Sequence, residues 1–263
     1  WEKDFVFSGS VGSYNQSPFF REIRNKYGDI NQNIKSQKSI HYVLSSDYQF
    51  RMWERPFKFN ASVYYKYLWD LIPYEINNLQ VNYLTNEIAT GYATGLDLKL
   101  YGEFVPGVDS WFSMSLLSTQ EDILGDGYGF IPKPTDQRLK FSIFFQDYLP
   151  KLPTYKVNLN LSYGSGLPFG ANNSTRDQQT MRMPSYKRMD IGFSKLIKQP
   201  QFKSKYKFFN FFNSITVSAE IYNLLGIRNT GSYIWITDAS NNRYAVPNYL
   251  TSRLLNIKLS AEF

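Results

Sequence analysis

The chain has 263 residues, enough for one large domain or two small ones, and it contains no cysteine, which excludes disulfides, thiolate catalysis and cysteine-based metal sites. Its apolar runs are only a few residues long, whereas a membrane-spanning helix needs roughly 18. The net charge of +7 comes from Lys and Arg scattered singly along the chain, so we expect no nucleic-acid partner. Aromatic residues make up 18% of the sequence, and Tyr and Trp are enriched at membrane interfaces.

Alternation of apolar and polar residues predicts ten β-strands. In chain order they span residues 4–14, 38–50, 57–68, 92–104, 110–119, 137–147, 154–164, 186–197, 213–223 and 250–263. The last is the clearest, because Leu255, Ile257 and Leu259 fall on one face while Asn256 and Lys258 fall on the other. Strands of about 9–11 residues cross a bilayer at a tilt, so the predicted strands are long enough to span one.

Short and long connections alternate between these strands. The short ones are 51–56, 105–109 and 148–153, and the long ones are 15–37, 69–91, 120–136, 165–185 and 224–249. This alternation is typical of antiparallel transmembrane β-barrels, which have short periplasmic turns and long external loops. A soluble all-β protein is disfavoured, because no further strands remain to cover the apolar face.

One connection breaks this alternation. Residues 198–212 are long although they belong at the periplasmic end, and we expect Tyr206–Phe212 to extend the following strand. Four lysines in this segment are interpreted as belonging to a solvated turn: Lys198, Lys203, Lys205 and Lys207.

Residues with catalytic or metal-binding chemistry are few. His41 is the only histidine, and Asp47 on the same strand is about 20 Å away along an extended chain, so we expect a lumen-facing side chain and not a catalytic pair. Glu121, Asp122 and Asp126 lie among glycines but lack the spacing of a calcium-binding loop, and we expect a solvated loop. We therefore predict no enzymatic activity, no metal and no cofactor.

Ligand contacts are expected in the external loops and the upper lumen, where aromatic and arginine side chains can hold sugars, peptides or ferric chelates. The same residues could instead belong to an interfacial aromatic belt or to loop packing. The candidates are Arg21, Arg24, Trp69, Asp70, Tyr74, Arg176, Tyr233 and Trp235.

Several short motifs, in this order, resemble those of TonB-dependent outer-membrane receptors, and together they cover nearly the whole chain. They are Gln16-Ser-Pro-Phe-Phe-Arg21, Ala93-Thr-Gly-Leu-Asp97, Ser165-Gly-Leu-Pro168, Arg188-Met-Asp-Ile-Gly192, Glu220-Ile-Tyr-Asn-Leu-Leu-Gly-Ile-Arg-Asn229 and Tyr244-Ala-Val-Pro247, followed by Arg253 and a terminal strand that ends on Phe263. Asp97 departs from the family pattern, in which Glu is commoner at this position.

This resemblance implies a 22-stranded barrel with an N-terminal plug in the cell outer membrane, which takes up ferric chelates, vitamins, oligosaccharides or peptides with energy delivered by TonB. Because the chain has neither an initiator Met nor a signal segment, we expect residues 1–263 to be the C-terminal portion of such a barrel, although removal of a signal peptide is an alternative. The implied partners are outer-membrane lipid, the remaining strands and plug, TonB through the missing N-terminal part, and a lipoprotein over the external loops.

Two other functions stay open on the sequence alone. One is a receptor-like barrel that acts as a structural or docking subunit of an outer-membrane complex. The other is a complete ten-stranded barrel with hydrolase activity.

Overall fold

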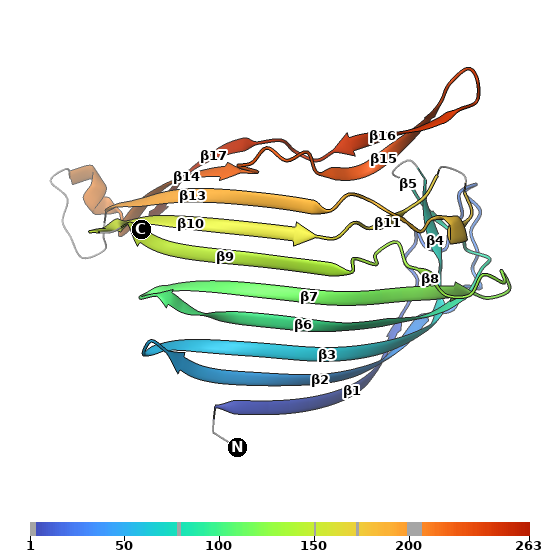
Figure 1. Cartoon of the computed structure of the whole chain (residues 1–263), viewed down its shortest axis with the longest axis horizontal. Coiled ribbons are helices and arrows are strands. Elements are labelled where there is room, and N and C mark those ends of the chain that lie inside the picture. The colour runs from blue at the N-terminus through green and yellow to red at the C-terminus, as the bar shows by residue number, and fades with distance from the viewer. Residues whose placement is uncertain (1–3, 78–79, 150, 172–173, 199–206) are drawn as a thin grey trace.

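The computed structural model describes residues 4–77, 80–149, 151–171, 174–198 and 207–263. Within these residues, ten long strands form one antiparallel sheet in which each strand pairs with the next long strand along the chain (Figure 1). They are β1 (Phe5–Gln16), β2 (Gln37–Met52), β3 (Arg55–Leu71), β6 (Ala89–Val105), β7 (Val108–Ile123), β9 (Leu139–Leu149), β10 (Leu152–Gly164), β13 (Tyr186–Lys198), β14 (Ser214–Tyr222) and β17 (Leu254–Glu262). The all-β class and the ten predicted strands are confirmed.

The pairing register places apolar residues beside apolar ones and polar residues beside polar ones. One row across five strands consists of Leu44, Val63, Leu96, Leu116 and Leu139. The adjacent row, on the opposite face, consists of Ser45, Ser62, Asp97, Ser115 and Lys140. Because side chains alternate between the faces of a strand, the sheet has one apolar and one polar face.

Both faces of the open sheet are accessible. On the apolar face, Leu44 is 55% exposed, Val63 54% and Leu259 70%. On the polar face, Asp97 and Lys140 are exposed and line part of a pocket with Asn60.

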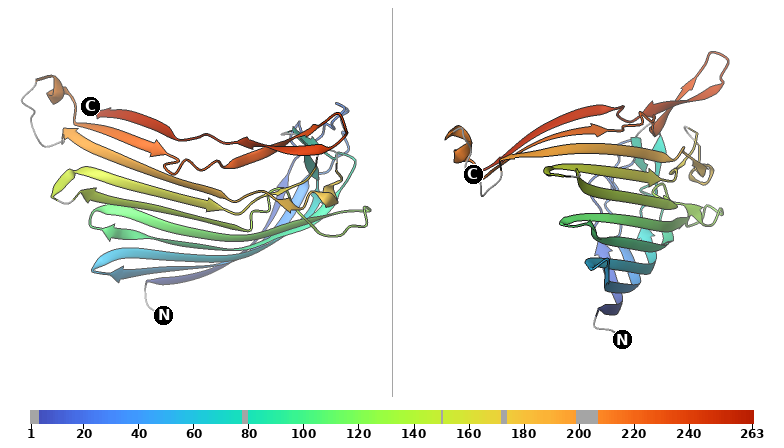
Figure 2. Two further views of the ribbon diagram at one scale, coloured as in Figure 1. Left: turned by 45° about the horizontal axis from the view of Figure 1, so that its top comes forward. Right: turned by 60° about the vertical axis from the view of Figure 1, so that its left-hand side comes forward.

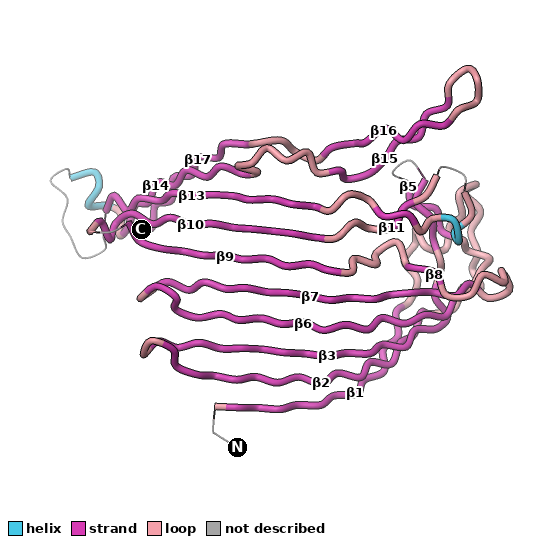
Figure 3. Tube along the Cα trace, viewed as in Figure 1, coloured by secondary structure: helices cyan, strands magenta, loops and turns pink. Residues whose placement is uncertain are grey.

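The two ends of the sheet differ, and we name them by their connections. The turn end carries the β2–β3, β6–β7, β9–β10 and β13–β14 connections, and the C-terminus lies there (Figure 1). The loop end carries the longer connections (Figure 3), and seven further strands of the described residues lie there in four groups. These are the β4 (Tyr74–Asn77)–β5 (Gln80–Tyr83) hairpin, strand β8 (Ile131–Pro132) on β7, the β11 (Pro168–Phe169)–β12 (Met181–Arg182) pair and the β15 (Thr230–Thr237)–β16 (Arg243–Tyr249) hairpin.

Several element boundaries differ from the sequence expectation. Strands β2, β3, β6 and β7 extend beyond their predicted ends, so that Glu121 and Asp122 belong to β7 and not to a solvated loop. The predicted extension of β14 is wrong in its described part, because Lys207–Phe211 forms the short 3-10 helix η2, while Tyr206 lies outside the described residues. A second 3-10 helix, η1 (Arg176–Gln178), lies at the loop end.

The sheet is curved but open. In the part of the chain that the structure describes, β1 and β17 each pair on one side only, and they lie at opposite edges (Figure 2). The sheet therefore matches a segment of a barrel and not a closed one. A small buried cluster of Leu71, Ala89 and Ile123 lies toward the loop end of β3, β6 and β7. None of the described helices has the length and apolar character that crossing a membrane requires.

Candidate binding site

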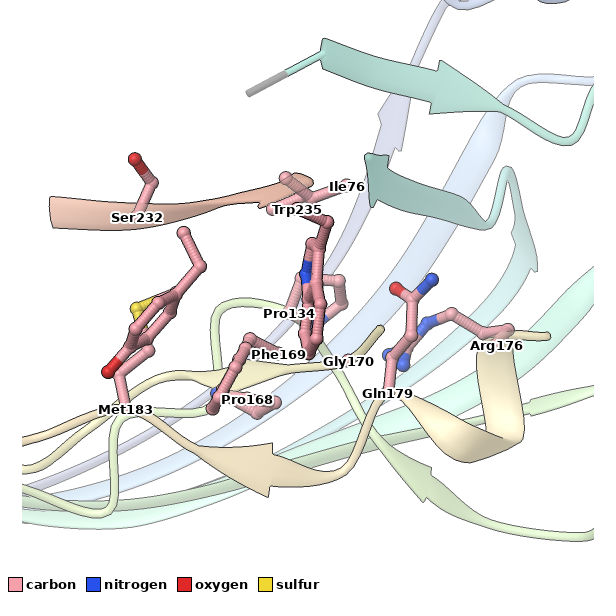
Figure 4. A pocket seen from close by; sticks show the side chains of 11 residues that line it. Ile76, Pro134, Pro168, Phe169, Gly170, Arg176, Gln179, Met183, Ser232 and Trp235 are labelled. Atoms are coloured by element: carbon pink, nitrogen blue, oxygen red, sulfur yellow. The ribbon is translucent and has the colours of Figure 1, made fainter. Parts of the chain in front are cut away.

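A pocket at the loop end brings together segments that are far apart in the sequence (Figure 4). Its empty volume is about 470 Å3, including space that is open to solvent. Its walls come from β4, the segment after β8, the β11–β12 pair, η1 and β15. The lining residues are Ile76, Pro134, Pro168, Phe169, Gly170, Arg176, Gln179, Met183, Ser232, Tyr233 and Trp235.

Arg176 is held at this pocket by a buried ion pair. Its Nε and Nη2 donate hydrogen bonds to Oε1 of Glu121 over 3.1 and 3.0 Å, and Nη2 also donates to the carbonyl of Pro132. Arg176 is 5% exposed and Glu121 1%, and Lys133 Nζ lies 3.6 Å from the second Glu121 oxygen. Nη1 of Arg176 has no hydrogen-bond partner within the described residues. This buried N–H group can therefore donate a hydrogen bond to an oxygen atom of a ligand in the pocket.

Asp136 organises the neighbouring loops in a similar way. It is fully buried, and its carboxylate accepts hydrogen bonds from the backbone N–H of Thr119 (2.7 Å), from Arg138 (2.8 Å) and from Arg182 on β12. Arg182 also donates to the backbone carbonyl of Asp136. These bonds join the end of β7, the start of β9 and the β11–β12 pair, which carries Pro168 and Phe169 into the pocket wall.

The β15–β16 hairpin supplies the aromatic side of the pocket. Tyr233 stacks on Phe169, with ring centroids 4.8 Å apart and an interplanar angle of 19°. Trp235 reaches from the same strand toward Pro134 and Gly170 (Figure 4). Flat apolar walls of this kind bind a planar ligand face by stacking, while Arg176 offers a hydrogen-bond donor.

Two of the sequence motifs, residues 188–192 and 220–229, fix the base of this hairpin through hydrogen bonds. Asp190 accepts hydrogen bonds from Arg188 (2.7 Å) and from the backbone N–H of Asn223 (2.8 Å). Asn223 bonds both polar groups of its side chain to the backbone of Ile227, and Asn229 makes two 2.8 Å bonds to the backbone of Lys187. These motif residues therefore have structural roles at the base of the hairpin.

Of the eight candidate residues, only Arg176, Tyr233 and Trp235 line this pocket. Tyr74 does not line it, although it lies on β4, the strand that carries the lining residue Ile76. Burial raises the pKa of the Tyr74 phenol, the Glu121 carboxylate raises it further, and Arg176 acts in the opposite direction.

The other four candidates lie elsewhere. Arg21 and Arg24 line a separate pocket with Tyr83, and the Arg24 guanidinium lies 5.1 Å from the Phe20 ring centroid. Asp70 is bound to Lys38 over 2.7 Å. Trp69 stacks on Tyr67 along β3, with ring centroids 5.8 Å apart. The structure therefore divides the candidates among several places.

Sequence reasoning missed most of the apolar lining and both buried carboxylates. Pro168 lies in one of the sequence motifs, and the run Ile234-Trp-Ile236 before Asn241-Asn242 is a hairpin signal inside a segment that we expect to be a loop. Burial of Glu121 depends on Arg176, which is 55 residues away, and no local pattern reveals such a pair.

Outside this pocket, His41 has neighbours other than an acidic side chain. His41 contacts the Ser39 hydroxyl over 2.9 Å and packs on the Tyr14 ring at a centroid distance of 4.3 Å. The described residues contain no group of three or more His, Asp or Glu side chains arranged to hold a metal ion.

Comparison with known proteins gives a likeness in fold. No protein-family model and no curated protein matches the sequence. A solved structure of the ferric-catecholate import receptor Fiu from E. coli K12, in its closed form, superposes with a TM-score of 0.64 at 12% sequence identity. The match covers 97% of this chain and 32% of that receptor, so the chain spans about a third of its length. At this identity the likeness shows the fold alone, that of a segment of a β-barrel.

Proposed function

We propose that this chain is part of an outer-membrane receptor of the TonB-dependent type, which takes up a scarce nutrient. The observation that carries the proposal is the apolar face, which runs in register across the strands and is exposed, with Ile257 and Leu259 both 70% exposed. A contiguous apolar surface of this size is unfavourable in water but matches the lipid-facing surface of an outer-membrane barrel. The fold likeness to Fiu and the ordered motifs support the same class.

In this proposal the ten strands occupy part of a larger barrel, and residues 1–263 form its C-terminal portion. The open edges at β1 and β17 support it, because unpaired backbone groups in hydrocarbon each cost several kcal/mol. Further strands would complete the wall, a plug would fill the interior, and TonB would act through the plug.

The loop-end pocket is the proposed ligand contact. Ferric chelates, vitamins, oligosaccharides and peptides all remain candidate ligands. Arg176, Tyr233 and Trp235, which line the pocket, would contact the ligand. Glu121 neutralises the positive charge of Arg176. The pocket therefore favours a neutral hydrogen-bond acceptor of the ligand over an anionic group.

The test is binding and uptake by the full-length protein. A panel of a ferric catecholate, cobalamin, maltoheptaose and a hydrophilic oligopeptide would be titrated against the purified protein and supplied to cells. We expect one of these to bind, and its uptake to stop when an uncoupler collapses the proton gradient. Trp235→Ala should weaken that binding, whereas Trp69→Ala, whose side chain does not line the pocket, should leave it unchanged. Energy-independent uptake, or equal effects of the two variants, would contradict the proposal.

One observation favours the alternative of a docking subunit. The β15–β16 hairpin projects from the loop end (Figure 1), and its outward face carries Ile234, Ile236, Tyr244 and Val246, each at least 40% exposed. A stoichiometric partner that co-purifies with the protein and is lost in an Ile236→Asp variant, without any effect on uptake, would support that function.

A further inference from the structure

We propose that a second pocket at the loop end, separate from the pocket of Arg176 and Trp235, binds the phosphate group of a polar ligand. This pocket, hereafter the basic pocket, lies between the segment that follows β1 and strand β5, both at the loop end (Figure 1). Its polar lining consists of Arg21, Arg24, Asn25, Lys26, Asn82 and Tyr83. The inference goes beyond nutrient uptake and does not depend on it.

The basic pocket gathers three cations and no acidic side chain. Arg21, Arg24 and Lys26 line it, and none of its described lining residues is Asp or Glu. Among the residues that the structure describes, none of the three cations forms an ion pair. Cations that share one pocket repel each other, so an anion between them is favoured.

The acidic residues of the same segment point their hydrogen bonds elsewhere. Residues 15–37 contain only Glu22 and Asp29 as acids. Glu22 is 8% exposed and accepts a hydrogen bond from the backbone N–H of Phe19 over 2.9 Å. Asp29 accepts one from the side-chain amide of Asn25 over 3.0 Å. Neither acid lines the basic pocket, so its positive charge is not neutralised from within the segment.

The wall that carries the cations is preorganised by its own backbone. Arg24 and Ile30 form a β-bridge, which closes a tight turn between them. Within this turn, Oδ1 of Asn25 accepts hydrogen bonds from the backbone N–H groups of Tyr27 and Asp29, both over 2.9 Å. The positions of Arg24 and Lys26 are therefore set before any ligand arrives.

Two of the three cationic groups also rest on aromatic rings. The guanidinium of Arg24 lies 5.1 Å from the ring centroid of Phe20, and Nζ of Lys26 lies 5.3 Å from that of Tyr27. A ring restricts the motion of a cation without supplying a negative charge. Both groups thus keep their charge available to an anion.

The opposite wall is joined to the first. The side-chain amide of Asn31 donates a hydrogen bond to the carbonyl of Thr85, two residues after β5, over 2.7 Å. Strand β5 pairs along its length with β4, and the rings of Tyr83 and Tyr74 lie 5.8 Å apart. Because both walls are held in place, binding costs less conformational entropy than it would in a loose loop.

The set of donors matches a phosphate better than a carboxylate. A phosphate monoester carries about −1.5 to −2 charges at pH 7 and three acceptor oxygens. Two guanidinium groups and one ammonium can each donate a charge-assisted hydrogen bond to these oxygens, and the amide of Asn82 adds a neutral donor. A carboxylate has one charge and two oxygens, so it would leave part of this set without a partner.

The surroundings of the basic pocket indicate what carries the phosphate. An adjoining pocket shares Asn25, Lys26, Asn82 and Tyr83 with it and adds Asn86 and Glu87. The carboxylate of Glu87 disfavours a second anionic group there, and it accepts hydrogen bonds from hydroxyl groups. A neutral, hydroxylated carrier with a single phosphate therefore fits the two pockets together.

Calorimetric titration of the full-length protein in detergent, in phosphate-free buffer of low ionic strength, tests the site. The probe is glucose 6-phosphate, with glucose as the neutral control and glucuronate as the carboxylate control. We expect glucose 6-phosphate to bind, more weakly as salt screens the charges, and both controls to bind far more weakly. No binding of glucose 6-phosphate, or equal binding of either control, would overturn the proposal.

Two double variants locate the site. Arg21→Gln/Arg24→Gln should weaken the binding of glucose 6-phosphate at least about tenfold, as expected for the loss of charge-assisted hydrogen bonds. Lys35→Gln/Arg228→Gln removes the same charge from the loop end outside the basic pocket and should leave binding unchanged. Equal losses in the two double variants would overturn the proposal.

The variants are checked for folding by the shift between bands on gels with and without heating. Arg21 and Arg24 are exposed, so their replacement should not prevent folding. Lys26→Gln retains both arginines and should weaken binding severalfold, which gives a second reading if the double variant fails to fold. Unchanged binding in a folded Lys26→Gln variant would exclude this lysine from the site and contradict the proposal.

Trp235→Ala distinguishes the basic pocket from the pocket of Arg176. It alters only the latter, so the binding of glucose 6-phosphate should persist. Loss of that binding would place the phosphate in the other pocket and overturn the proposal, while the proposed uptake function would stand.

The same phosphate chemistry can come from a soluble molecule or from a lipid headgroup. The titration would be repeated in phosphatidylcholine vesicles with and without phosphatidic acid, whose headgroup is a phosphate monoester. Competition by phosphatidic acid, absent from Arg21→Gln/Arg24→Gln, would support the site with a lipid as its occupant. Unchanged affinity for glucose 6-phosphate would support the site with a soluble occupant.

Discussion

At the scale of single residues, the buried pair of Arg176 and Glu121 positions the pocket wall more than it stabilises the fold. Removing two charges from water is costly, and their attraction only roughly offsets that cost. Removing one partner is different, because the other charge is then left buried. The pair therefore makes the loop end sensitive to single substitutions at either position.

We predict that Arg176→Met lowers the free energy of unfolding by about 3–5 kcal/mol, because Glu121 is then left buried with Lys133 as its nearest cation. The double variant Glu121→Leu/Arg176→Met should be clearly more stable than Arg176→Met. Denaturant titration of the full-length protein in detergent would measure both. Equal stability of the single and double variants would show that the pair is not buried as described.

Asn223 offers a second test at this scale. It is 3% exposed, and its φ of 51° lies in the left-handed region, which Asn and Gly adopt more readily than other residues. Asn223→Ala should cost about 1–3 kcal/mol, since it adds backbone strain and removes two side-chain hydrogen bonds to Ile227.

Asn223→Gly is the matched control for Asn223→Ala. Glycine adopts this backbone conformation without strain, but it does not restore the two side-chain hydrogen bonds. The stability of Asn223→Gly should therefore fall between those of Asn223→Ala and the parent protein in the same titration. An alanine variant as stable as the parent would remove the structural role assigned to the two motifs.

At the scale of elements, β17 tests the assignment of the two faces. Leu259 pairs with Val217, and Lys258 pairs with Ser218 on the opposite face. If the apolar face contacts lipid, Leu259→Arg near the bilayer midplane should destabilise the barrel by roughly 2–4 kcal/mol. Lys258→Gln should have little effect. The shift between folded and unfolded bands on gels, with and without heating, measures both.

The opposite result has a definite meaning. A sensitive Lys258 and a tolerant Leu259 would place the pairing one residue out of register, because a one-residue slip moves every side chain of the strand to the other face.

The strands were predictable because their signal is local, whereas their ends and the pocket were not. Alternation along Phe57–Tyr67 is visible in the sequence, and the structure extends the same strand to Leu71. Beyond the alternating part, β7 continues through Glu121, whose backbone pairs with β6 and β8 and whose side chain is buried against a distant arginine. Likewise, Tyr233 belongs to the pocket only because the hairpin brings its ring onto Phe169, which is 64 residues earlier in the sequence.

At the scale of the whole molecule, the open edges determine what the sheet requires. The outward sides of β1 and β17 have no partner strand within the described residues. Exposed edges of this length invite pairing with another strand. Under the proposed function, the missing neighbours are strands of the same barrel.

We therefore predict that the native species extracted from the membrane has an intact mass well above the 30.7 kDa of this chain. Mass spectrometry of the purified protein under denaturing conditions measures this and excludes non-covalent assembly as the cause. A native polypeptide of 30.7 kDa would require β1 and β17 to pair with each other or with a second chain.

The order of the strands also has a kinetic consequence. Every long strand pairs with the long strand that precedes or follows it in the chain, so each new pairing closes only the loop between two neighbours. Closing the loop between two neighbours, even a long one, costs less conformational entropy than pairing strands that lie farther apart in the chain. The sheet can thus grow one hairpin at a time, and the slow step is left to its two free edges, where the partner must arrive from elsewhere.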